Sequence, residues 1–250
     1  KLCNVTQPPF SAVGDNHTDD TVAIQHAIDT CGDLSTGGIV LLPSGHQFVV
    51  GSLWLRSNLT FVVEPKAVLM GSTNWSAYPM VYTRAGCVMM TAHASLLNGG
   101  ECLDMKDPLV GWDDCARWSK LENVAIIGGG EINGNGDQWQ QCQPTCPDGT
   151  DTSQRPTLLG LLWIDGLTIS NVKLRHPAAW TMHPTFSNNV KIVNNDVLAT
   201  QPGTDGCDPD SCWNVYIANN TLSTRDDCIA LKAGKDWSGR MVNISTENVL

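Results

Sequence analysis

The sequence of 250 residues has little positive charge and no long hydrophobic run. Against 25 Asp and Glu it carries only 15 Lys and Arg, which gives a formal net charge of −10. No basic field would gather phosphates, so this balance argues against a protein that binds nucleic acid or an anionic membrane surface. No apolar run approaches the roughly 18 residues that a membrane-spanning helix needs, so we expect no membrane span. Only 16% of the residues are charged and 42% are hydrophobic, which excludes a disordered tail and a coiled coil.

The sequence also lacks CxxC pairs, a Cys/His zinc spacing, an initiator Met and an apolar leader. Its ten cysteines are therefore interpreted mainly as disulfides in an oxidising compartment. The start at Lys1 suggests a mature form from which a signal peptide has been removed. Six N-x-S/T sequons agree with export, and together with the cysteines they predict a secreted, extracellular glycoprotein. The candidate glycosylation sites are Asn4, Asn16, Asn58, Asn74, Asn219 and Asn243.

One amphipathic helix is predicted near the start of the chain, over residues 18–32. An Asp-Asp-Thr run at 19–21 supplies the N-terminal signals, and apolar residues at 23, 24, 27, 28 and 31 share one helical face. Gly32 follows the last of them and ends the pattern. Residues 37–43 then form a short buried-strand pattern between turn residues, and the rest of the chain continues in this manner.

The later two thirds of the chain repeats a short pattern. A small or polar residue is followed by an apolar residue, any residue and a second apolar residue, in segments that begin at 123, 166, 189 and 214. A fifth copy begins at 248, and an early copy begins at 58. We interpret these intervals as a unit of roughly 21 to 25 residues, doubled once after 123 and enlarged once by a loop after 214.

Such a unit is too short for a βαβ crossover and lacks the helical periodicity of leucine-rich or tetratricopeptide repeats. Three short strands per unit, stacked in register, would form a parallel β-helix filled by the Val, Ile and Leu of successive coils. An antiparallel β-sandwich also has recurring strands, but it does not explain the longer self-similarity. The sequence therefore predicts an all-β parallel β-helix, one domain over residues 1–250, with the helix at 18–32 capping its open end.

Three aspartates are expected to meet on the lateral face of this β-helix. Asp205 precedes Asp226 and Asp227 by about one repeat, so the two groups should lie on adjacent coils about 4.8 Å apart. Like charges at that distance raise the pKa of one carboxyl, which leaves one acid beside ionised bases. Hydrolysis of a glycosidic bond requires such a set. Turn stabilisation or a calcium site would use the same residues and stays open at this point.

The stretch from 203 to 234 resembles the signature region of glycoside hydrolase family 28, the polygalacturonases. It reads GTDGCD at 203–208 and RDDCIALKAG at 225–234, where the family reads approximately NTDGxD and GDDCIAxKSG. Further matches are DDTVAIQ at 19–25, GGGEINGNG at 128–136 and WTMHP at 180–184, so the resemblance covers nearly the whole chain. It implies a right-handed parallel β-helix and a secreted hydrolase that needs no metal or other cofactor. The implied substrate is pectin or polygalacturonan, cleaved at its α-1,4 galacturonosyl linkages.

The resemblance also implies roles for single residues. Asp226 matches the general acid of the family, and Asp205 and Asp227 match the pair that activates water for single displacement with inversion. Lys232 matches a lysine beside the site, and Arg225 and His183 are further candidates for substrate binding. Two positions depart from the family pattern. Gly203 replaces an Asn, and Arg225 replaces a Gly, so that Arg225 either fills part of the cleft, pairs with an aspartate or binds a uronic carboxylate.

In the family a Gly-His-Gly motif and then an Arg-x-Lys motif follow the Asp pair, whereas this sequence ends at Leu250. We expect Leu250 to be a processing or cleavage end, and a second polypeptide to carry the missing C-terminal coils. Two alternatives to an active hydrolase remain. One is a catalytically inactive relative that serves as a carbohydrate-binding or assembly protein. The other is a calcium-dependent pectate lyase on the same fold, which the acid-base character of the aspartates disfavours.

Overall fold

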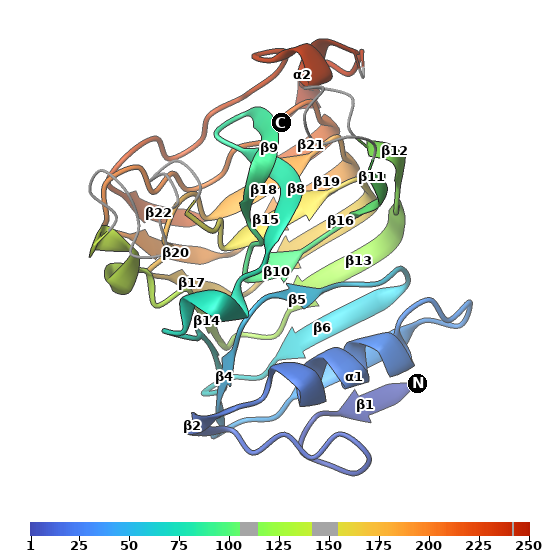
Figure 1. The fold of residues 1–250 in the computed structure, drawn as a ribbon, viewed down its shortest axis with the longest axis vertical. Coiled ribbons are helices and arrows are strands. Elements are labelled where there is room, and N and C mark those ends of the chain that lie inside the picture. The colour runs from blue at the N-terminus through green and yellow to red at the C-terminus, as the bar shows by residue number, and fades with distance from the viewer. Residues whose placement is uncertain (106–114, 142–154, 242) are drawn as a thin grey trace.

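The structure is a computed structural model that describes residues 1–105, 115–141, 155–241 and 243–250. Most of the strands lie in three parallel sheets, and within each sheet successive strands are stacked along one long axis (Figure 1). The chain passes from the first sheet to the second, then to the third, and returns to the first, so each circuit adds one coil. The predicted right-handed parallel β-helix is therefore confirmed.

The three sheets form the walls of the β-helix. Within the described ranges, the first sheet contains, in spatial order, β1 (Leu2–Asn4), β3 (Gly38–Leu42), β6 (Leu59–Val63), β13 (Leu121–Ile127), β16 (Ile164–Ser170), β19 (Asn188–Val193), β21 (Trp213–Ala218) and β23 (Glu247–Val249). The second sheet contains β2 (Asp15–Asp19), β4 (Gln47–Val50), β7 (Val68–Gly71), β14 (Glu131–Asn133), β17 (Lys173–Arg175), β20 (Asp196–Ala199) and β22 (Thr221–Thr224). The third sheet contains β18 (Met182–Thr185), β15 (Leu159–Leu162), β10 (Leu97–Asn98) and β5 (Leu53–Trp54).

The repeated apolar segments all lie in the first sheet, in register with one another. Leu59 pairs with Val124, Val124 with Leu167, Leu167 with Val190, and Val190 with Val215, and all five side chains are buried. Because side chains alternate between the two faces of a strand, this register turns one apolar row inward along the whole solenoid. One prediction about the intervals is wrong. Strand β13 pairs directly with β16, so the long interval after 123 is one coil enlarged by an insertion and not two coils.

The backbone conformation explains why each repeated segment begins with a small or polar residue. Asn58, Asn123, Asn189, Asn214 and Asn248 all adopt left-handed backbone angles, with φ between 52° and 55°. Asparagine tolerates this region better than other residues with a side chain, and Gly166, with φ of 81°, occupies the same place in the remaining coil. The asparagines also bond one another from coil to coil, as Asn123 Nδ2 does to Asn58 Oδ1 at 3.0 Å.

Several insertions interrupt the coils. Two antiparallel hairpins, β8 (Met80–Ala85) with β9 (Val88–His93) and β11 (Cys102–Met105) with β12 (Cys115–Trp118), enlarge the coil between β7 and β13. The short helices η1 (Trp75–Ala77), η2 (Gly136–Gln141) and α2 (Trp237–Met241) lie in other loops. The β8–β9 hairpin matters most for the site, because it packs beside the third sheet (Figure 1).

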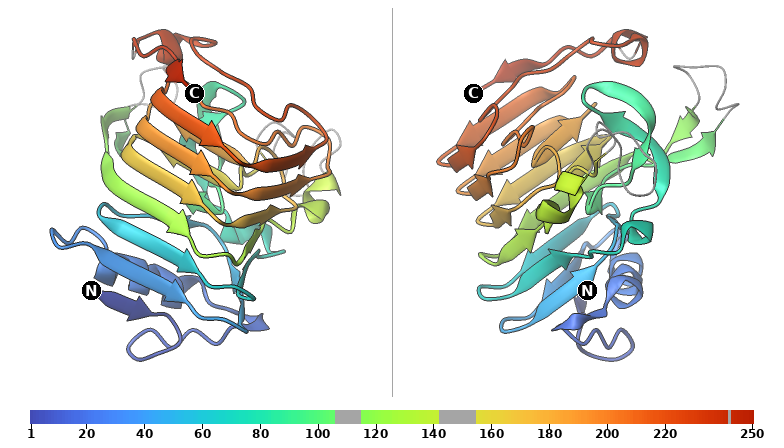
Figure 2. Two further views of the ribbon diagram at one scale, coloured as in Figure 1. Left: turned by 180° about the vertical axis from the view of Figure 1, so that it is seen from behind. Right: turned by 60° about the vertical axis from the view of Figure 1, so that its left-hand side comes forward.

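The predicted capping helix is present as α1 (Thr21–Cys31), at the N-terminal end of the solenoid (Figure 2). Its buried face, formed by Ile24, Ala27, Ile28 and Cys31, covers the first coil and excludes water from it. Asp20 does not cap the helix through its side chain, because its carboxylate accepts the backbone N–H groups of residues 13 and 14 instead. No helix in the described ranges is both long enough and apolar enough to cross a membrane.

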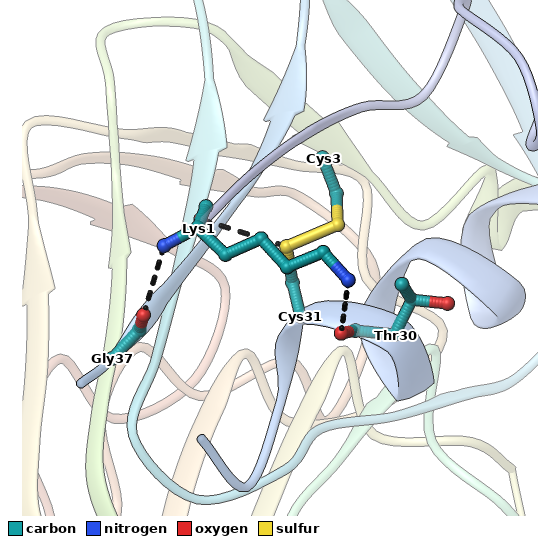
Figure 3. Close-up of a disulfide and its surroundings, with 5 residues drawn as sticks. All are labelled: Lys1, Cys3, Thr30, Cys31 and Gly37. Carbon is teal, nitrogen blue, oxygen red and sulfur yellow. Dashed lines mark hydrogen bonds between the residues drawn. A yellow bond between two sulfur atoms is a disulfide. The ribbon is translucent and has the colours of Figure 1, made fainter. Parts of the chain in front are cut away.

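A disulfide fastens the helix to the first strand. Cys3 of β1 is bonded to Cys31 at the end of α1, and Lys1 bonds both Gly37 O and Thr30 O beside it (Figure 3). A cross-link of this kind stabilises the cap chiefly by restricting the unfolded chain. The disulfide agrees with the predicted secretion, because disulfides persist in oxidising compartments.

The expectation that the cysteines serve mainly as disulfides is wrong for four of them. Cys102 is also disulfide-bonded, but Cys87, Cys207, Cys212 and Cys228 are free thiols, and Cys142 and Cys146 lie outside the described residues. Cys207 and Cys228 are about one coil apart in the sequence but are not bonded to each other. In the structure Cys207 pairs with Ile229, so Cys228 is one residue out of register and its side chain points to the opposite face.

Candidate active site

The third sheet continues past β18 as two further coils, and these carry the acidic residues. Met182 bridges to Cys207 and Cys207 to Ile229, while Asp210 bridges to both Thr185 and Lys232. Prolines at 184 and 209 have no N–H to donate, which reduces the ladder here to isolated bridges. Segments 205–210 and 227–232 therefore extend the outer face of the third sheet.

Asp205, Asp226 and Asp227, together called the acidic patch, lie close together. One carboxylate oxygen from each lies within 4.8 Å of the others, so the predicted meeting of these residues on adjacent coils is confirmed. Gly206 permits the close approach: its N–H donates to Asp227 O at 2.9 Å, and a Cβ there would lie 2.5 Å from Cys228 O. Asp205 is buried, whereas Asp226 and Asp227 are exposed. Burial, with a contribution from the other two aspartates, raises the pKa of Asp205.

Lys232 supplies positive charge to this patch. Its Nζ lies 3.6 Å from Asp205 Oδ2, 3.5 Å from Asp208 Oδ1 and 4.0 Å from Asp227 Oδ2, and 4.8 Å from the ring centroid of Trp180. Burial opposes the charge, but Asp208 and Asp205 outweigh it and raise the pKa of Lys232. A fixed ammonium beside two of the three aspartates does part of what a bound cation would do, which weakens the case for calcium.

Asp208 is a member of the site that sequence reasoning passed over. Its side chain is fully buried, and neither carboxylate oxygen has a hydrogen-bond partner among the described residues. Burial and the nearby Asp205 raise the pKa of Asp208 to about 8, against the effect of Lys232. The buried carboxyl therefore holds a proton at neutral pH. Asp208 is the last residue of the GTDGCD run, but its burial could not be read from that run. Only the pairing of the coils shows that Asp208 lies in register with His183 of β18.

A second buried network lies at the other end of the same coil. Arg84 of β8 has no exposed side-chain surface, and its Nε donates to Asp210 Oδ2 at 2.5 Å. Its Nη1 lies 3.1 Å from Asp236 Oδ1, and Asp236 Oδ2 accepts the backbone N–H of Met89. Although burial alone would raise it, His183 and Arg84 lower the pKa of Asp210 to about 2. The network joins the β8–β9 hairpin to the coil that carries Lys232.

The other two candidate substrate-binding residues lie apart from each other. His183 is fully buried, 3.7 Å from Asp210 Oδ2 through Nε2, and burial lowers its pKa, so its ring is neutral at pH 7. Arg225 is exposed, and its backbone N–H donates to Ala199 O. None of the ion pairs in the described part of the chain includes Arg225. Of the three roles considered for Arg225, pairing with an aspartate is therefore not seen.

The sequon asparagines are all at least partly accessible. Asn16, Asn74, Asn219 and Asn243 are exposed, and Asn4 and Asn58 are half-buried. Asn4 Oδ1 accepts from Thr6, the hydroxyl residue of its own sequon, and Asn74 Oδ1 accepts from Ser76 in the same way. Attachment of glycans at these positions stays a prediction.

The Asp208→Asn variant is expected to be more stable than the wild type, by a margin that grows as the pH rises from about 4 to about 8. In this window the folded protein holds a proton that the unfolded chain has released, because a model Asp titrates near pH 4. The free energy of unfolding of the wild type therefore falls, by up to about 1.4 kcal/mol per pH unit. Urea denaturation of wild type and variant at pH 5 and pH 8 measures the difference, and parallel pH dependence in the two proteins would contradict it.

Clustered carboxylates, one of them with a raised pKa, on the side of a parallel β-helix define a site suited to acid-base cleavage of glycosidic bonds. Residues 104–250 match the sequence profile of glycosyl hydrolases family 28, and residues 3–87 match that of the rhamnogalacturonase A/epimerase, pectate lyase-like family. The chain belongs to glycosyl hydrolases family 28.

Individual relatives agree with this assignment. A probable polygalacturonase of Vitis vinifera is 30% identical over 96% of this chain and 46% of its own length, and an exo-poly-alpha-D-galacturonosidase of Dickeya chrysanthemi is 29% identical over 94% and 42%. The solved structure of a hyperthermoactive exopolygalacturonase from Thermotoga maritima superposes with a TM-score of 0.79 at 23% identity, over 100% of this chain and 58% of that one. The chain spans about half the length of the curated relatives it matches. The second polypeptide stays a prediction that these comparisons do not support.

Proposed function

We propose that this protein is a secreted glycosidase that hydrolyses the α-1,4 galacturonosyl linkages of pectic polysaccharides. The observation that carries the proposal is the acidic patch, whose carboxylate oxygens lie within 4.8 Å of one another beside the ammonium of Lys232. Membership of family 28 and the polygalacturonase relatives support the choice of substrate. The Cys3–Cys31 disulfide and the accessible sequons support secretion.

The residues would share the chemistry as follows. Asp226, which is exposed, donates a proton to the glycosidic oxygen as the bond to the leaving sugar breaks. Asp205 and Asp227 form the pair that activates water: one of the two, as a carboxylate, accepts the proton that the water releases as its oxygen bonds to the anomeric carbon. Lys232 holds both side chains in place. Arg225 is exposed on the same coil as Asp226 and Asp227 and would bind a uronic carboxylate, while the buried His183 would support the floor of the site.

Release of the β-anomer as the first product is expected, because single displacement at an α-linkage inverts the anomeric carbon. The spacing of the carboxylates does not by itself favour inversion. Inverting enzymes usually separate their two carboxyl groups by about 6.5–9.5 Å and retaining enzymes by about 5–5.5 Å. The patch, within 4.8 Å, lies nearer the second range, whereas the family resemblance implies inversion. Proton NMR of the earliest products decides, and the α-anomer as first product would assign Asp205 or Asp227 the role of nucleophile.

The activity itself is tested on polygalacturonic acid. We expect new reducing ends, the same rate in the presence of a chelator, and products without a double bond. Loss of activity with the chelator, together with unsaturated products, would show a calcium-dependent lyase instead. Binding of the polymer without any new reducing ends would show a non-catalytic carbohydrate-binding relative. The last outcome has one observation in its favour, the exposed Arg225 directly before the Asp pair, which is why the assay needs both readouts.

A further inference from the structure

A cavity of about 330 Å³ lies beside the third sheet, away from the acidic patch. Its floor is made by Trp54 of β5, Asn98 of β10 and Gly160 of β15, and the β8–β9 hairpin, including Tyr82, forms one wall. Glu101, just before β11, closes another side. Cavities from about 300 Å³ upward are large enough for small ligands, so this one can hold a single sugar ring.

The cavity and the acidic patch lie along one face of the solenoid. Trp54 pairs with Asn98, Asn98 with Gly160, and Gly160 with His183. The bridge of Met182 to Cys207 places Asp208 next in the same row. Three strand spacings separate Asn98 from Asp208, a distance of about 14 Å along the axis. A polysaccharide that is cut at the patch can therefore place another of its units in the cavity.

The lining suits a sugar more than an apolar ligand. Trp54 and Tyr82 present aromatic surface of the kind that packs against the C–H face of a pyranose ring. Asn98 is committed to the backbone, because its amide bonds Leu53 O and both backbone groups of Ser95, so it forms a rigid floor. Glu101 lines the cavity as well, and its carboxylate oxygens are of the kind that accept hydrogen bonds from sugar hydroxyls.

The charge of the lining decides which sugars fit. Among the described lining residues there is no Lys, Arg or His, and Glu101 is the only one with an acidic side chain. Its backbone is fixed, because its N–H donates to Ser119 Oγ at 2.7 Å and its carbonyl accepts from Ser119 N at 2.8 Å. A uronic carboxylate in the same cavity would face this carboxylate across a few ångströms, and like charges at that range repel.

We propose that the cavity binds one uncharged pyranosyl unit of the pectic substrate and rejects free galacturonate. An uncharged unit has two sources, a neutral sugar carried by the chain or a galacturonate whose carboxyl is methyl-esterified. The inference rests on the proposed function for the identity of the polymer, pectin, whereas the binding of a single sugar unit in the cavity can be tested without any hydrolysis. The cavity thereby selects substituted or esterified stretches of pectin, while the cationic groups Lys232 and Arg225 lie near the patch.

Three methyl glycosides test the proposal by ligand-observed NMR: methyl α-D-galactopyranosiduronic acid, its methyl ester, and methyl β-D-xylopyranoside. We expect at least one of the two uncharged glycosides to bind about tenfold more tightly than the free acid, and which of them binds identifies the source. In Glu101→Gln the preference over the free acid should shrink severalfold. In Tyr82→Ala binding of the uncharged glycoside should fall.

Tyr216→Ala is the matched control, because Tyr216 is an exposed tyrosine of the first sheet, 47% accessible, and lies away from the cavity. Glu101→Gln keeps the shape of the side chain, so it tests the charge even if Tyr82→Ala fails to fold. Equal or tighter binding of the free acid, unchanged in Glu101→Gln, would overturn the proposal, as would binding of none of the three. Since no linkage between galacturonate units is cut in these measurements, their failure is distinct from a failure to release reducing ends.

Discussion

Asp226→Asn is expected to lower the rate of hydrolysis of polygalacturonic acid by about 10²- to 10⁴-fold, the usual contribution of a general acid. The substitution keeps the shape of the side chain but removes the proton that the leaving oxygen needs. Because Asp226 is exposed, the fold should be unaffected. Initial rates of reducing-end release by the wild type and the variant measure the effect. Retained turnover in the variant would refute the assignment of Asp226 as the acid.

The neighbouring aspartates provide further arms of the same experiment. Asp205→Asn and Asp227→Asn should also abolish turnover, because they remove the groups that activate water. The buried Asp205 has a raised pKa, so Asn at that position should leave stability unchanged or increase it, which separates lost chemistry from lost folding. Asp165→Asn is the matched control: Asp165 is an exposed residue of the first sheet, and its Oδ1 accepts from Asn189, which the amide oxygen can still do. Its rate should equal that of the wild type.

Arg84→Ala is expected to lower the free energy of unfolding by about 3–5 kcal/mol, because it leaves Asp210 buried and unpaired. For a chain of this size the melting temperature should fall by about 6–20 °C. The loss should shrink below about pH 4, where the unfolded chain takes up the proton that Arg84 and His183 keep off Asp210 in the folded protein. Urea denaturation at pH 7 and pH 3 measures both effects.

The control for this prediction removes both charges. In Arg84→Met with Asp210→Asn the fully buried carboxylate loses its charge together with its partner, and Asp236 keeps the backbone N–H groups of Met89 and Gly239. The double variant should therefore recover part of the stability lost in Arg84→Ala. A change below about 1 kcal/mol in the single variant, the value typical of an exposed ion pair, would contradict the account of the buried network. So would a double variant that is less stable than the single one.

Local pattern was sufficient to predict the fold and to place the acidic patch. The left-handed residue and the inward apolar pair recur in the segments of the first sheet that begin at 58, 123, 166, 189 and 214, so these segments can be matched from the sequence. Asp205 and Asp227 could be brought together in the same way, because the interval between them is one coil. The interval after 123 was misjudged because an insertion inside one coil has the same length as a second coil.

The buried network could not be predicted from the sequence. Arg84 and Asp210 are 126 residues apart, and Arg84 lies in an inserted hairpin that carries none of the repeat. The raised pKa of Asp208 depends on the burial of its side chain and on the nearby Asp205 and Lys232, which no spacing rule records. Cys207 and Cys228 show that the number of residues between two positions does not by itself predict a contact. Cys228 is one residue out of register with Cys207, so its side chain lies on the opposite face of the strand.

The central claim is that the acidic patch hydrolyses pectic chains, and product analysis in water enriched in ¹⁸O tests it most directly. Polygalacturonic acid is treated with the purified protein, and the products are weighed by mass spectrometry. Hydrolysis predicts saturated fragments that have gained one ¹⁸O at the new reducing end, released about 10²- to 10⁴-fold more slowly by the Asp226→Asn variant. Unsaturated fragments without the label, or an intact polymer, would contradict the account.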